Sequence, residues 1–178
     1  TVALLTQALS VCQSANGARA WWRSDTSTDT YEWFQPEKLT LCRVNLMRVL
    51  CEPLGAEDAC AEVGTAAGLP ALLLDVLRAG TASSGVRWAA EAACAIRCLA
   101  ALSAYRECSA QLETSSDCLP LLCNELSKAA HGCPAERLVE SISLQLHAVY
   151  CLTNLAHSET GCRAIAASDA PGILECIL

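Results

Sequence analysis

Cysteine and histidine are the residues best suited to chemistry in this chain of 178 residues, which contains thirteen cysteines and three histidines. Thiolates and imidazoles bind zinc, and a Cys–His pair can act as nucleophile and base. Cys94 and Cys98 are four residues apart, as are His147 and Cys151, so each pair would share one face of a helix. Zinc ligands usually come from C-x-x-C pairs, however, and the chain has none. We therefore expect no metal and no other cofactor.

The histidines do not suggest a catalytic site. His131, His147 and His157 fall in helical or connecting segments without a supporting constellation of other catalytic residues. The glycine-rich phosphate-binding, H-E-x-x-H, EF-hand and G-x-S-x-G motifs are also missing. We expect a protein without catalytic residues. A helical enzyme or regulatory domain with one reactive thiol is the alternative, and labelling of the native thiols would distinguish the two.

The positions of the cysteines indicate reduced thiols. Their number is odd, and the chain has no N-x-S/T sequon for glycosylation. These features predict a reducing compartment, the cytoplasm, with the nucleus and the cytoskeleton as alternatives. A free thiol packs in a helix as a small hydrophobe. Seven of the cysteines lie in apolar helical stretches, where we expect them to be buried: Cys42, Cys51, Cys94, Cys98, Cys123, Cys151 and Cys176.

The composition predicts an all-α fold. Alanine and leucine dominate, aromatic residues are few, and no segment shows the strict alternation of a half-buried strand. Although 53% of the residues are hydrophobic, no uninterrupted apolar run is longer than the one from Leu69 to Leu74. A membrane helix needs about 20 such residues, so we expect a soluble chain without membrane insertion.

The charge of the chain excludes some classes of partner. The formal net charge is −7, and the twelve lysines and arginines are scattered without a basic stripe. Nucleic acids and anionic membranes are therefore poor partners. We expect a protein or an extended peptide as the partner, and no small-molecule substrate.

A pattern of three helices recurs along the chain. Leu50, Leu99 and Leu152 each lie near the end of an apolar helix, 49 and 53 residues apart, and each is followed by a cysteine, an aliphatic residue, a breaker and a further apolar helix. Such a unit cannot bury its apolar faces alone and has to stack on copies of itself. The pattern divides a single solenoid segment, residues 1–178, into the end of a preceding repeat (1–13), an insertion loop (14–36) and three repeats (37–79, 86–130 and 135–178). We expect this segment to be part of a longer protein.

The third copy resembles an armadillo repeat. Its segment from Tyr150 to Ala156, YCLTNLA, is similar to the family pattern W-x-x-x-N-[IL]-A, and the corner Gly68-Leu69-Pro70 is similar to the one that opens the family's LPxLLxLL helix. Tyr150 replaces the tryptophan, and Ala101 and Glu52 stand where the other copies would carry the asparagine. The resemblance implies a right-handed α-solenoid of armadillo or HEAT type with about three and a half repeats.

The resemblance also implies a binding site. In armadillo proteins the matching aromatic and asparagine side chains lie on a concave groove, where the amide can hydrogen-bond the backbone of an extended peptide. The partner-binding residues implied for this chain are Tyr150, Asn154, His147, Arg97, Arg48 and Glu52. As an alternative, Asn154 bonds the neighbouring backbone near its helix end, and the charged residues form a solvated helix face.

Residues 18–36 contain an aromatic-rich loop. Trp21, Trp22, Trp33 and Phe34 flank a polar run, so their rings either dock on the solenoid, which we favour, or contact a partner. The function predicted from all these features is a protein–protein interaction scaffold within a larger assembly. A structural component of a cytoskeletal or filament assembly is a further alternative.

The sequence also predicts three local features. The helix from Leu39 to Cys51 should bury Leu39, Leu46, Val49 and Leu50. Ser158 is placed to cap the short helix that follows it. Residues 169–172, which include Pro171 and Gly172, should form a corner before the last helix.

Overall fold

A computed structural model describes residues 3–10, 36–54, 68–81, 86–130 and 138–177 of the chain. Within these ranges the regular secondary structure is α-helical and contains no strand, which confirms the all-α prediction. Residues 3–10 form a first helix. The other helices are α2 (Pro36–Leu54), α4 (Leu69–Thr81), α5 (Val86–Ser103), α6 (Arg106–Thr114), α7 (Cys118–Ala130), α8 (Leu138–Leu155), α9 (Glu159–Ala166) and α10 (Ala170–Ile177).

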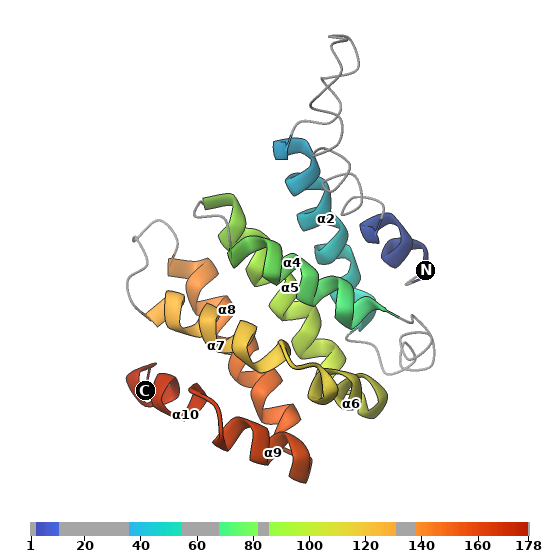
Figure 1. Cartoon of the computed structure of the whole chain (residues 1–178). Helices are drawn as coiled ribbons and strands as arrows, with labels where there is room; N and C mark the ends of the chain where they lie inside the picture. The colour runs from blue at the N-terminus through green and yellow to red at the C-terminus, as the bar shows by residue number, and fades with distance from the viewer. Residues whose placement is uncertain (1–2, 11–35, 55–67, 82–85, 131–137, 178) are drawn as a thin grey trace, which may run out of the picture.

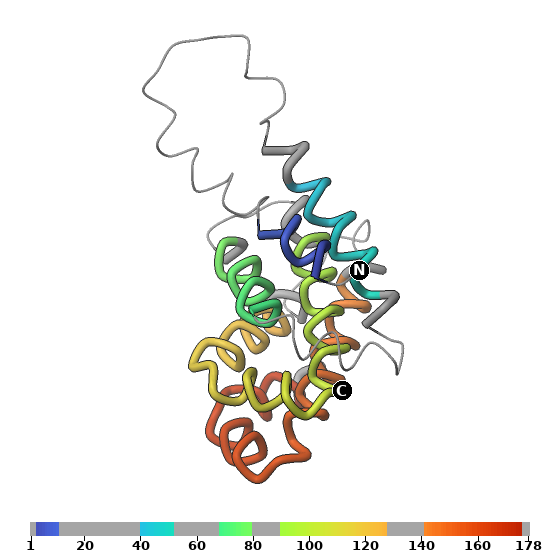
Figure 2. Tube along the Cα trace, turned by 90° about the vertical axis from the view of Figure 1, so that its right-hand side faces the viewer, coloured from blue at the N-terminus to red at the C-terminus, as the bar shows by residue number. Residues whose placement is uncertain are grey.

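The helices pack in two layers. The long helices α2, α5 and α8 lie side by side in one layer, where α5 contacts both of the others (Figure 1). Helices α4, α7 and α10 form the other layer, with α4 packed on α5 and α7 packed on α8. Figure 2 shows the two layers edge-on, the long helices on the right and the shorter ones on the left. The short helices α6 and α9 contact both layers at one end of the molecule.

Helix α5 is the centre of the core. It is flanked by α2 and α8 and covered by α4, so most of its described side chains are buried. Three of them, Ala92, Ala95 and Ala100, are alanines with at most 1% exposure, and their small size lets neighbouring helices approach closely. Leu50, Leu99 and Leu152, which define the sequence pattern, are buried on α2, α5 and α8 and belong to the same hydrophobic core.

The junction between α8 and α9 is fixed by Ser158 and Gly161. As predicted, Ser158 caps α9: its Oγ accepts a hydrogen bond of 2.8 Å from the backbone N–H of Gly161. Gly161 is buried against the end of α8, and a Cβ at this position would overlap the carbonyl oxygen of Leu155. Only glycine therefore fits where α9 turns across α8.

The start of α4 also depends on glycine. Gly68 has φ of +105°, a conformation that favours glycine, and its carbonyl oxygen accepts a hydrogen bond of 2.9 Å from Leu72 N–H. The Gly68-Leu69-Pro70 corner predicted from the sequence is therefore a sharp entry into α4, with Pro70 in the first helical turn.

Three local predictions are wrong. Val49 is not a core residue but 54% exposed, and Cys42 is exposed although it lies in α2. The packed side of α2 is instead formed by Val44, Met47 and Leu50. The corner predicted at residues 169–172 lies two residues earlier, at 167–169. Pro171 and Gly172 belong to the first turn of α10, where the missing N–H of proline does no harm.

Other predictions fall outside the described residues. The aromatic loop with Trp21, Trp22, Trp33 and Phe34 is one of them, and the middle part of the first predicted repeat, residues 55–67, is another. Leu39 and Glu52 lie within α2, but their side chains are not described. The division of the chain into repeats stays a prediction.

Candidate functional site

Large hydrophobic side chains are exposed mainly on two helices of the long-helix layer. Five of the six such residues in the described part of the chain belong to α2 or α8. They are Leu41, Val49, Ile142, Leu146 and Tyr150, and the sixth is Leu4 in the first helix. Apolar side chains of this size on a surface mark sites of interaction when they occur together.

On α8 the exposed residues form one stripe. Ile142, Leu146 and Tyr150 follow each other at intervals of four residues, so they lie on the same face of the helix. Their exposed fractions are 54%, 64% and 54%. Tyrosine is enriched at protein interfaces because its ring buries a large apolar area and its hydroxyl can hydrogen-bond.

Helix α5, between α2 and α8, presents small side chains and one charge. Arg97 is exposed near the middle of the helix, whereas Ala93, Cys94 and Ala101 are half-buried. Arg48 of α2 is also exposed. Burial raises the pKa of the Cys94 thiol, and the positive charge of Arg48 opposes this rise. Arg48 and Arg97, both predicted to bind a partner, are 49 residues apart in the sequence. In the structure they lie on the neighbouring helices α2 and α5.

Asn154 has a hydrogen bond within the fold. Its side-chain amide donates to Oγ of Ser103 on α5 at 3.0 Å, and that hydroxyl in turn donates to the carbonyl oxygen of Ala100 at 2.7 Å. Ser103 is buried, so the bond satisfies a polar group at the α5–α8 contact. This arrangement is close to the alternative role of Asn154, a hydrogen bond within the fold near the end of its helix. A contact between Asn154 and a partner stays a prediction.

His147 is half-buried on α8. Its Nδ1 donates to the carbonyl oxygen of Ser143, one turn earlier, at 2.6 Å. Because a carbonyl oxygen can only accept, Nδ1 of His147 carries the hydrogen of this bond. His147 lies one turn from Tyr150, which the sequence also placed in the site.

A buried ion pair fixes α2 against α5, and sequence reasoning missed it. The Arg43 guanidinium on α2 donates from Nε to Oε1 of Glu91 on α5 at 2.7 Å, and its Nη2 lies 2.6 Å from the same oxygen. Both side chains are about 90% buried, and Nη1 of Arg43 is buried without a hydrogen-bond partner among the described residues. No local pattern links two residues 48 positions apart.

None of the nine described cysteines forms a disulfide, and most of them are buried. Burial raises the pKa of Cys151 to about 11 and also raises the pKa of Cys118. Cys51 differs from these, because its pKa is lowered by a hydrogen bond with Cys98 and by the charge of Arg97, against the effect of burial. No group of three or more metal-binding side chains occurs in the described ranges.

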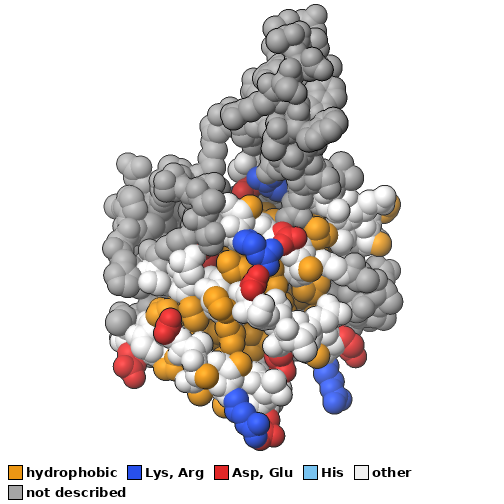
Figure 3. All heavy atoms as spheres, in the orientation of Figure 1, with side chains coloured by type: hydrophobic (Ala, Val, Ile, Leu, Met, Phe, Trp, Pro, Cys, Tyr) orange, Lys and Arg blue, Asp and Glu red, His pale blue; other side chains and the backbone are white. Residues whose placement is uncertain are grey.

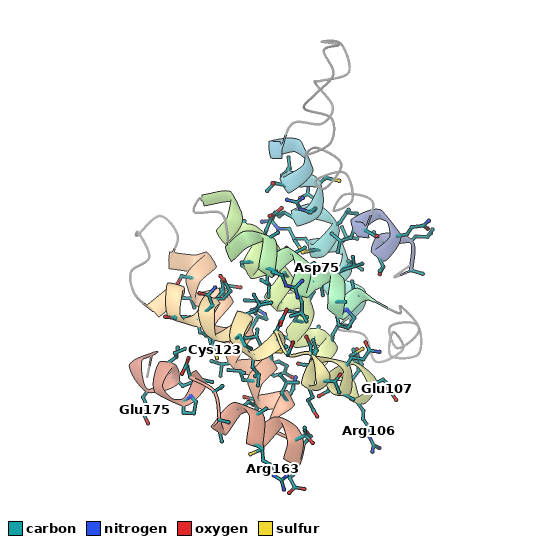
Figure 4. The ribbon with its side chains drawn as sticks, in the orientation of Figure 1. Asp75, Arg106, Glu107, Cys123, Arg163 and Glu175 are labelled. Atoms are coloured by element: carbon teal, nitrogen blue, oxygen red, sulfur yellow. The ribbon has the colours of Figure 1, made fainter. Side chains whose placement is uncertain are left out.

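The opposite layer has a different surface. None of the large hydrophobic side chains exposed in the described ranges belongs to α4, α7 or α10. Figure 3 shows this side of the molecule, where the charged side chains are scattered and hydrophobic atoms lie between them. Arg106 and Arg163 project away from the helices at its edge (Figure 4). Arg78 of α4 pairs with Asp75 on its own helix and, at 2.6 Å, with Asp117 before α7.

No family model, curated protein or solved structure matches the chain. Over the described residues, no helix combines the length and the apolar character needed to cross a membrane.

Proposed function

We propose that this protein is a non-catalytic interaction scaffold that binds a protein segment or extended peptide on the exposed side of α2, α5 and α8. The concentration of exposed large hydrophobic residues on α2 and α8 is the observation that carries the proposal. Between them, α5 offers mostly small side chains and the Arg97 guanidinium. An extended segment could place apolar side chains against α2 and α8 and a carboxylate near Arg97.

The proposed architecture is a right-handed α-solenoid of armadillo type. Its support is the order of the helices: a long helix, a short helix and a third helix occur as α5, α6, α7 and again as α8, α9, α10. The long helices form one layer and the third helices the other (Figure 2). Stacked units of this kind provide an elongated surface, and a partner contacts several units at once. We place this scaffold in the cytoplasm, which is a reducing compartment.

The proposal is tested with peptides selected on the protein itself. A display library of random peptides is panned against the intact chain, and the affinity of the selected peptides is measured for Leu146→Ala and Tyr150→Ala. Each substitution should weaken binding by about ten-fold or more, which corresponds to roughly 1.4 kcal/mol for an interface residue that carries binding energy.

Leu4→Ala is the matched control. Leu4 is also a large, exposed hydrophobic residue, at 72% exposure, but it belongs to the helix formed by residues 3–10. Its replacement should leave the affinity unchanged. Selected peptides that bind equally well to the Leu146 and Tyr150 variants, or that lose affinity only with Leu4→Ala, would refute the proposed surface.

A further inference from the structure

Two thiols from different helices meet in the core between α2 and α5. Sγ of Cys51 lies 3.1 Å from Sγ of Cys98, although the residues are 47 positions apart in the sequence. Cys98 has no exposed surface, and its Sγ also lies 3.3 Å from the carbonyl oxygen of Met47, to which it can donate. Cys51 keeps an exposed fraction of 8%. The pair therefore has one partly accessible thiol and one enclosed thiol.

The separation of the two sulfurs favours a bond between them over a shared metal. Two thiolates on a tetrahedral zinc ion, each about 2.3 Å from the metal, stand roughly 3.8 Å apart. The observed pair is already closer, and a disulfide would bring the sulfurs together by about 1 Å more. Among the described side chains, no set of three metal ligands includes this pair.

The surroundings make Cys51 the more reactive thiol. Its hydrogen bond with Cys98 and the nearby Arg97 guanidinium lower its pKa, whereas the bond with Cys51 and complete burial raise the pKa of Cys98. Burial also raises the pKa of neighbouring Cys94. The thiolate is the form that attacks peroxides, so oxidation should begin at Cys51.

We propose that Cys51 and Cys98 are a peroxide-oxidised thiol pair that forms a reversible disulfide between α2 and α5. The Cys51 thiolate attacks one oxygen of hydrogen peroxide, the O–O bond breaks, and Cys51 sulfenic acid and hydroxide result. The sulfur of Cys98 then attacks the sulfenic sulfur and loses its proton, and water leaves. In total, two thiols and one hydrogen peroxide give one disulfide and two waters, and a dithiol reductant reverses the change.

The experiment treats the reduced, intact chain with hydrogen peroxide, blocks the remaining thiols and maps the peptides by mass spectrometry without reduction. Trypsin and Glu-C together release the peptides 49–57 and 98–106. Cys51 is the sole cysteine of the first peptide, and Cys98 is the sole cysteine of the second. The expected product is these two peptides joined, with the loss of two free thiols per chain. Dithiothreitol should restore both thiols.

Matched variants separate the pair from general thiol oxidation. Cys94→Ser should form the same cross-linked peptide, because Cys94 is a neighbour outside the pair. Cys98→Ser should form none and should instead accumulate sulfenic acid at Cys51, which dimedone traps. The proposal is overturned if Cys51 and Cys98 stay reduced while the exposed Cys42 and Cys162 are oxidised, or if Cys51 joins a different cysteine.

Discussion

At the scale of single residues, Gly161 is a position where the fold does not accept a larger side chain. Its N–H is the group that the Ser158 hydroxyl caps, and its missing side chain leaves room for the backbone of Leu155 at the end of α8. Two requirements therefore fall on the same position: a donor for the cap and space for a crossing helix. The sequence revealed the cap, because serine before an acidic first turn is a known signal. The sequence could not predict that a side chain at position 161 would overlap Leu155, because this overlap depends on how α8 and α9 cross.

Gly161→Ala should lower the free energy of unfolding by about 1–3 kcal/mol, the usual range for overpacking a closely packed site. Gly172→Ala is the matched control, because a Cβ there has nothing within 4 Å. Alanine favours helix over glycine, so this variant should be unchanged or up to about 1 kcal/mol more stable. Urea unfolding followed by circular dichroism measures both. Equal stability of the two variants would show that α9 does not pack on Leu155 as described.

At the scale of helices, the contact between α2 and α5 combines charged and apolar groups. Helices α2 and α5 carry the buried Arg43–Glu91 ion pair, the close Cys51–Cys98 thiols, and core residues such as Met47 and Leu50. Taking both charges out of water is unfavourable, and their attraction offsets this only while both partners are present. The pair therefore gives specificity to the orientation of α2, since a rotation of the helix would leave a charge buried alone.

Arg43→Met or Glu91→Leu alone should destabilise the protein by about 3–5 kcal/mol, because each leaves one buried charge without its partner. The double variant should recover most of that loss, since it buries apolar groups in place of both charges. Chemical unfolding of the four proteins completes the double-mutant cycle. If the losses of the single variants simply add in the double variant, the two side chains do not interact.

The sequence predicted where helices occur better than it predicted which face of a helix is packed. The all-α class, the buried anchors Leu50, Leu99 and Leu152 and the cap at Ser158 followed from local patterns. Val49 was misplaced because α2 carries apolar residues on both sides and buries an arginine, so its periodicity does not identify the packed face. The contacts Arg43–Glu91 and Cys51–Cys98 join residues nearly fifty positions apart, and no local signal predicts them.

Over the whole molecule, the two layers have different surfaces. Of the six large hydrophobic side chains exposed in the described ranges, five belong to α2 or α8 of the long-helix layer, which also carries the Arg48 and Arg97 charges. The surface of the α4, α7, α10 layer carries none of the six and has ion pairs such as Arg78 with Asp117. The core between them is continuous from α2 to α10. A binding surface on the long-helix layer can therefore extend over several helices without changing how the layers pack.

Nuclear magnetic resonance of the isotopically labelled protein with a selected peptide tests the central claim most directly, because every amide reports on its own surroundings. The account predicts that the largest chemical-shift changes lie on the exposed positions of α2, α5 and α8, including Arg97, Leu146 and Tyr150. Changes confined to α4, α7 and α10, with those three residues unaffected, would contradict it.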